Sequence, residues 1–138
     1  MVLETRADYG VLNFVRHRRE AKAQYLRVPA ATTAPVIVDF MQQQWGLPEP
    51  GLLLHITGSA QDFDLQEHVG GVGVNAVTEG IVHAASLTDA WIVTGGLDAG
   101  VMRLVGSTVA RFNYKCTVPV IGVASWRGVQ ESAGRPCQ

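Results

Sequence analysis

Three apolar runs of strand length occur in the chain, at residues 52–57, 90–94 and 118–124. None of them alternates apolar and polar positions as a strand with one face in water does, and continuous apolar runs are typical of buried strands in a parallel sheet. We therefore predict three parallel strands. We expect the first of them, residues 52–57, to be buried on both faces.

Segments with helical periodicity precede and separate these runs. One begins at Thr33, which can cap a helix, carries Pro35 in its first turn and stops at Gly46. A second occupies the later half of residues 65–85, and a third occupies residues 101–112. Strands that alternate with glycine loops and helices form βαβ units. The predicted fold class is therefore α/β, a three-layer sandwich whose short parallel sheet is truncated at its C-terminal side, because three strands are readable where five or six are usual.

Charge is distributed unevenly along the chain. Residues 1–30 hold six Lys or Arg and three acidic residues, whereas the remaining residues hold five and nine. We interpret residues 1–35 as a basic lead-in of strand and loop, residues 36–130 as the folded domain and residues 131–138 as a polar tail. The basic segment lacks interleaved aromatic residues and the body is mildly acidic, so we expect no nucleic-acid partner.

Composition narrows the class of protein. The chain has 138 residues, of which 47% are hydrophobic and 17% charged, as in a single globular domain. Its apolar runs fall well short of the roughly 18 to 20 residues of a spanning helix, and its charged N-terminal segment does not resemble a signal peptide. Cys116 and Cys137 are expected to be reduced thiols, and no Cys/His spacing indicates a metal site. We therefore expect a soluble, cytoplasmic chain without direct membrane insertion.

Candidate chemistry lies in two glycine-containing loops that follow the first and second predicted strands. Both would leave the carboxyl edge of the sheet, where open α/β folds bind ligands. Glycine lets backbone amides approach an anion, and the next helix adds the partial positive charge of its N-terminus, so the pattern favours phosphate. The alternative is a pair of tight strand-to-helix turns. The candidate nucleotide-binding residues are Thr57, Gly58, Ser59, Ala60, Thr94, Gly95, Gly96, Asp98, Gly100, Val101 and Met102.

No catalytic set can be read from the sequence. Ser59 has no readable His–acid partner, and His55 and His83 are interpreted as structural histidines. The carboxylate of Asp98 could bind a ribose hydroxyl or cap a helix, and capping is the commoner role. We therefore expect a ligand-binding module with no catalytic residue, and not an enzyme.

Several segments resemble, in order and spacing, the N-terminal region of melastatin-type transient receptor potential (TRPM) channels. They are residues 9–10, 22–28, 45–50, 52–66, 80–85, 90–96, 100–102 and 121–126. This resemblance covers about residues 9–130 and implies a SLOG domain of the LSDAT type, which is a Rossmann-like fold, with residues 36–130 as part of it. The sequence departs from the family where Ser59 replaces a glycine and Ser125 replaces a proline.

The resemblance also implies a function. It implies a nucleotide-sensing regulatory domain, with ADP-ribose or a related nucleotide as ligand and no required cofactor. The parent would be a calcium-permeable cation channel, a homotetramer, with this domain on the cytoplasmic side of the membrane.

Two alternatives stay open. The first is a relative of the LOG-type nucleoside-monophosphate phosphoribohydrolases, which are similar in their first glycine loop. These enzymes also need a proline-glycine-glycine loop with a downstream glutamate, which this sequence lacks. The second is an assembly segment that binds no nucleotide and whose glycine loops are only turns.

Overall fold

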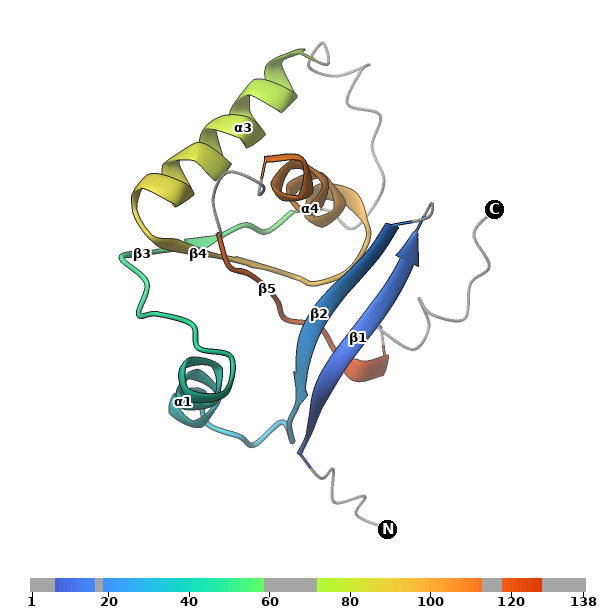
Figure 1. Cartoon of the computed structure of the whole chain (residues 1–138), viewed down its shortest axis with the longest axis vertical. Helices are drawn as coiled ribbons and strands as arrows, with labels where there is room; N and C mark the ends of the chain where they lie inside the picture. Colours follow the sequence, from blue (N-terminus) through green and yellow to red (C-terminus); the bar gives the residue numbers. More distant parts are fainter. Residues whose placement is uncertain (1–6, 17–18, 59–71, 113–117, 128–138) are drawn as a thin grey trace. The chain divides into compact units, whose positions relative to one another are not determined.

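The computed structural model describes residues 7–16, 19–58, 72–112 and 118–127 (Figure 1). By its internal contacts the chain forms two compact units, Met1–Glu49 and Pro50–Gln138. The division predicted at residues 35 and 130 stays a prediction.

The first unit contains an antiparallel hairpin of β1 (Asp8–Arg16) and β2 (Arg19–Arg27). In its register Gly10 lies opposite Tyr25, and the tyrosine ring covers the glycine so closely that a Cβ on Gly10 would lie 3.0 Å from Tyr25 Cε1. The Tyr25 hydroxyl donates a hydrogen bond of 3.1 Å to Asp8 Oδ2. The packing of the Tyr25 ring over Gly10 and the hydrogen bond between Tyr25 and Asp8 both favour the observed register.

Helix α1 (Ala34–Gln44) follows the hairpin in the same unit. It carries Pro35 at its first positions, as predicted, but the side chain of Thr33 makes no capping hydrogen bond. Gly46 has φ +66°, a left-handed conformation that ends the helix at little cost. The ring of Phe40 contacts those of Tyr9 and Trp45 edge-to-face, at centroid distances of 5.4 and 5.7 Å. Aromatic packing therefore joins α1 to β1 within this unit.

The second unit contains a parallel sheet in the order β3-β4-β5. Its strands are β3 (Leu52–His55), β4 (Ala90–Thr94) and β5 (Val120–Gly122). Helix α3 (Val72–Leu87) lies between β3 and β4 in the chain, and α4 (Gly100–Phe112) lies between β4 and β5. Both strand pairs are parallel, as the sequence predicts. The α/β fold class, with a short parallel sheet, is confirmed.

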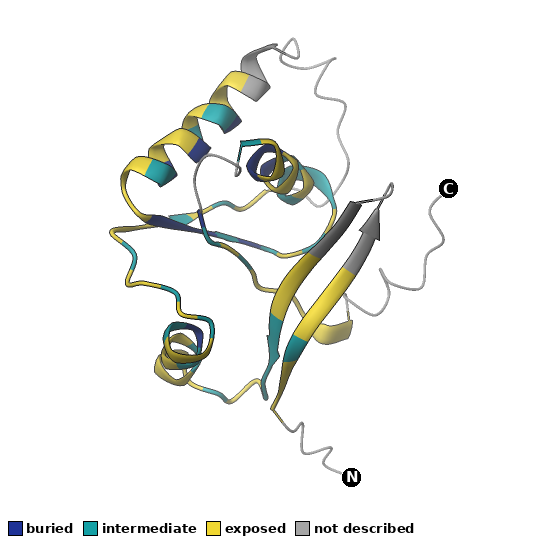
Figure 2. Ribbon diagram, in the orientation of Figure 1, coloured by how far each residue is buried: buried dark blue, intermediate teal, exposed yellow. Residues whose placement is uncertain are grey.

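The core of this unit forms where α3 and α4 pack against the central strand. Ile92 of β4 is fully buried, and Thr108 of α4 is 1% exposed, with its hydroxyl donating to the carbonyl oxygen of Leu104 at 2.9 Å. Both helices contribute to one cluster of buried residues and contact each other, so they form a single layer against the sheet (Figure 2). The described residues therefore show two of the three predicted layers, one of helices and one of strands. The cluster consists of Val82, Ala85, Ala90, Ile92, Val105, Val109 and Val118.

The expected burial of the first strand is wrong. Leu52 and Leu53 of β3 are 43% and 57% exposed, and His55 is also exposed. The reason is the position of the strand: among the described strands β3 pairs only with β4, so it lies at an edge of the sheet. An apolar run has the same sequence pattern at the edge and at the centre of a sheet.

Two helical glycines provide a test of the described packing. Gly80 in α3 and Gly106 in α4 are exposed, and a Cβ on either would meet no atom within 4 Å. Because alanine restricts the unfolded chain more than glycine does, Gly80→Ala and Gly106→Ala should each stabilise the fold by about 0.5–1 kcal/mol. Thermal unfolding should show a rise in Tm of about 2–5 °C for each. Gly51→Ala is the contrast and should lower Tm, because its Cβ would collide with the carbonyl oxygen of Thr88. A fall in Tm for either helical variant would contradict the open surroundings of that glycine.

The hairpin contact predicts a pH effect. The hydrogen bond to Asp8, together with partial desolvation and the negative charge of Asp8, raises the pKa of Tyr25 above its ordinary value of 10.0. The contact therefore stabilises the hairpin below pH 10 and is lost as the pH rises through the raised pKa. A spectrophotometric titration follows tyrosine ionisation, and comparison with Tyr25→Phe identifies the signal of Tyr25. In Asp8→Ala the pKa of Tyr25 should lie closer to its ordinary value than in the wild type. An unchanged midpoint would show that Asp8 does not control this group.

Candidate functional site

The carboxyl ends of the three parallel strands meet at one edge of the sheet. Gly58 follows β3, Gly95 and Gly96 follow β4, and Val123 follows β5. The backbone ladder extends to this edge, where the Ile56 N–H donates to the carbonyl oxygen of Val93 at 2.9 Å. The strand ends therefore bring the two predicted loops to the same place.

The first loop contacts the start of α4. A Cβ on Gly58 would lie 3.0 Å from Val101 Cγ1 and 3.1 Å from Val101 Cβ, so only a glycine fits there without displacing the valine. Of the predicted residues of this loop, Thr57 and Gly58 are exposed, whereas Ser59 and Ala60 lie outside the described residues. The predicted juxtaposition of the two loops is thus observed for Gly58 and Val101.

Thr94, the last residue of β4, accepts hydrogen bonds from the second loop and from the end of β5. The side chain of Thr94 is 6% exposed, and its hydroxyl oxygen accepts a hydrogen bond of 3.3 Å from the Gly96 N–H. Its carbonyl oxygen accepts a second bond of 2.9 Å from the Val123 N–H on the neighbouring strand. The amide of Gly96 is therefore directed towards Thr94. Gly96 has φ +70°, which a residue with a Cβ adopts only under strain.

The second loop leads directly into the N-terminus of α4. The helix starts at Gly100, and the Arg103 N–H donates to the carbonyl oxygen of Ala99 at 3.2 Å. The side chain of Met102, in the first turn of α4, packs against Gly95 of the loop. A Cβ on Gly95 would lie 2.5 Å from Met102 Sδ. The first N–H groups of a helix and its partial positive charge make this end of α4 favourable for an anion.

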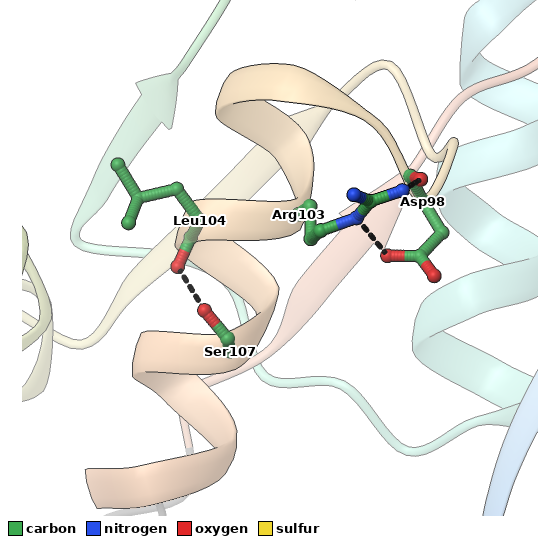
Figure 3. A network of polar contacts seen from close by, with 4 residues as sticks. All are labelled: Asp98, Arg103, Leu104 and Ser107. Carbon is green, nitrogen blue, oxygen red and sulfur yellow. Dashed lines mark hydrogen bonds and ion pairs between the residues drawn. The ribbon is translucent and has the colours of Figure 1, made fainter. Parts of the chain in front are cut away.

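Asp98 is paired with an arginine of the same helix. Its carboxylate accepts a hydrogen bond of 3.1 Å from Arg103 Nε, and its carbonyl oxygen accepts one from Arg103 Nη2 (Figure 3). Both side chains are about half exposed. One turn further on, the Ser107 hydroxyl donates to the carbonyl oxygen of Leu104 at 2.9 Å. The arginine thus braces the loop, a contact that neither sequence-based role for Asp98 included.

Gly122 and Val123 were not among the predicted site residues. Gly122 approaches Gly96 so closely that a Cβ on it would lie 2.6 Å from Gly96 Cα. The available signal was a glycine inside the short apolar run of residues 118–124, because a glycine within a strand often marks close approach of another backbone segment.

The part of the chain that the structure describes shows neither a cluster of metal-ligating side chains nor a membrane-spanning helix. There, no three His, Cys, Asp or Glu side chains group together as they would around a metal ion. The helices of the same residues are too short or too polar to cross a bilayer.

The brace between Asp98 and Arg103 can be tested by a double-mutant cycle. Because both side chains are exposed, the coupling free energy between Asp98→Ala and Arg103→Ala should be about 0.2–1 kcal/mol and should fall with added salt. The exposed pair of Arg111 and Glu79, at 3.6 Å, is the matched control and should give a smaller coupling. Equal coupling in both pairs, measured by denaturant unfolding, would mean that the shorter contact between the Asp98 carboxylate and Arg103 Nε contributes no more than an ordinary surface ion pair.

Comparison with known proteins identifies the family. The family model described as SLOG in TRPM matches residues 23–134 of this chain. The match includes both glycine loops and all three strands of the parallel sheet.

Curated relatives agree with this match. The Transient receptor potential cation channel subfamily M member-like 2 of Nematostella vectensis is 34% identical over 122 residues, which is 86% of this chain and 8% of that protein. Subfamily M member 2 of Mus musculus is 36% identical over 80% of this chain and 7% of that protein. The channel trpm of Drosophila melanogaster is 32% identical over 90% of this chain and 6% of that protein.

The chain therefore spans less than a tenth of the length of these channels. The resemblance inferred from the sequence segments is confirmed by a family match over most of the chain. The chain belongs to the family of SLOG domains found in TRPM channels.

Proposed function

We propose that this SLOG domain is a regulatory module that binds a phosphate-bearing nucleotide such as ADP-ribose. The observation that carries the proposal is the meeting of two strand-end glycine loops at the N-terminus of α4, seen in the approach of Gly58 to Val101 and of Gly95 to Met102. A pyrophosphate needs several donors that converge on one point, and backbone amides at a helix N-terminus provide them.

The charges around the loops are compatible with an anionic ligand. Asp98 is the acidic residue among the proposed binding residues, and Arg103 offsets its charge at 3.1 Å. The pair therefore adds no net charge at this end of α4, and the partial positive charge of the helix N-terminus stays favourable for an anion.

The context of the proposed module follows from its relatives. The names of those proteins describe cation channels, and the chain corresponds to a small part of each. We propose that the parent protein is a calcium-permeable TRPM-like channel, a tetramer, with this domain on the cytoplasmic side of the membrane. Nucleotide binding at the loops would then bias the channel between its closed and open states, and the pore would lie outside this chain.

Binding and its site can be tested together with the 138-residue chain. Calorimetric titration with ADP-ribose, AMP, ribose 5-phosphate and adenosine should give the tightest binding for ADP-ribose and none for adenosine, which lacks phosphate. Gly58→Ala adds a methyl group between the first loop and Val101, so affinity should fall at least tenfold. The loss of stability should be about 1 kcal/mol, at the lower end of the cost of overpacking, because Gly58 is exposed.

The matched control is Gly80→Ala, whose methyl group projects into open space on α3 and which should bind as the wild type does. Unchanged affinity in Gly58→Ala would remove the first loop from the site. A wild-type chain that binds none of the phosphate compounds would favour the assembly segment, and release of adenine from AMP above the rate without protein would favour the hydrolase.

A further inference from the structure

We infer that Gly122, at the end of β5, is the positioning residue that sets the conformation of the second loop for its ligand. The expected effect of Gly122 on ligand affinity rests on the proposed function, because the conformation of the loop matters for affinity only if the loop binds a ligand. The structural part of the inference, the control of the loop by Gly122, stands on the geometry of the strand ends alone.

The contact between Gly122 and Gly96 is reciprocal and made by backbone atoms on both sides. A Cβ on Gly122 would lie 2.6 Å from Gly96 Cα, and a Cβ on Gly96 would lie 2.9 Å from Gly122 C and 3.0 Å from Gly122 Cα. Separations under 3.0 Å require something to shift, and neither neighbour is a flexible side chain that could move aside. The two chain segments can cross here only because both positions lack a side chain.

Hydrogen bonds on either side fix this crossing in one register. The Val123 N–H, next to Gly122, donates to the carbonyl oxygen of Thr94 at 2.9 Å. The Gly96 N–H donates to the hydroxyl of the same threonine at 3.3 Å. Gly96 is thereby held at φ +70° between β4 and the end of β5. Because the loop continues into Gly100 and α4, fixing Gly96 also restricts the peptide groups that lead to the helix N-terminus.

The crossing also restricts the direction from which a ligand can approach. The backbone of Gly122 and Val123 occupies the side of Gly96 that faces β5. Gly58 approaches the start of α4 from β3, which lies on the opposite side of β4. A nucleotide phosphate at the loop would therefore lie over β3 and β4, and not over β5.

Gly122→Ala tests the inference, with Gly106→Ala as a matched control that adds the same methyl group to open space on α4. Hydrogen exchange of the Val123 amide should accelerate at least tenfold in Gly122→Ala, because the added Cβ separates β5 from the loop. The amides of Ile56 and Ile92, which donate to Val93 and Pro119 in the same sheet, should keep their protection. Affinity for ADP-ribose should fall at least tenfold, and Gly106→Ala should change neither quantity.

Three outcomes would overturn the inference: an unchanged Val123 amide, an equal loss of protection at Ile56 and Ile92, or a loosened loop with unchanged ADP-ribose affinity. If the wild-type chain binds no nucleotide, the proposed function fails, and the exchange data still decide whether Gly122 controls the loop.

A measurement on the wild-type chain keeps the test independent of whether Gly122→Ala folds. A nuclear Overhauser effect between the Hα atoms of Gly96 and Gly122 should be present without ligand and should persist after ADP-ribose is added, because a preset loop need not rearrange. Absence of this signal before the addition, or its loss afterwards, would overturn the inference.

Discussion

The parallel pairing of β4 with both β3 and β5 is the interaction on which the candidate site depends. Parallel strands end at the same edge of a sheet, so the chain leaves β3 and β4, and extends beyond β5, at neighbouring points. The burial of Ile92 beneath α3 and α4 holds the central strand in place. With β4 fixed, the positions of Gly58, Gly96 and Val123 follow from short connections to the strand ends.

Glycines at this edge of the sheet let segments of backbone approach one another closely. Gly96 and Gly122 approach each other through main-chain atoms, and Gly58 lies against the side chain of Val101. Backbone amides recognise phosphate without a positively charged side chain at each contact, and they need little reorganisation when a ligand binds. Such an arrangement of backbone amides suits the reversible binding that the proposed function requires.

The sequence predicted elements with strong local signals better than it predicted their surroundings. The apolar run of β4, and the periodicity of α4 that starts after Gly100, gave both elements nearly as observed. The apolar run of β3 has the same pattern as that of β4. The exposure of Leu53 depends on which strands pair, and the run alone does not contain that information. The second strand of the hairpin was missed, because its charged and polar residues hide the alternation that would mark it.

The candidate site shows the same limit. Glycine loops after two strands were readable, since a strand-to-helix turn has a local signature. The contact of Gly96 with Gly122 joins segments separated by a whole helix, and the pairing of Asp98 with Arg103 depends on how the loop enters α4. The glycine within the run of residues 118–124 can indicate a close approach of backbone but does not name its partner, and no sequence pattern pairs Asp98 with Arg103. The proposed ligand class, a nucleotide, comes from the family resemblance, because the residue types at these positions indicate only an anion such as phosphate.

Amide chemical shifts can show whether the strand-end loops form one nucleotide site. In a titration of the ¹⁵N-labelled 138-residue chain with ADP-ribose, the amides of Gly58, Gly95, Gly96 and Gly100 should shift together along one saturable curve. The amides of Gly80 and Gly106, in the helices, should stay in place. Saturable binding that leaves the four loop glycines unshifted, or no binding at all, would contradict the account.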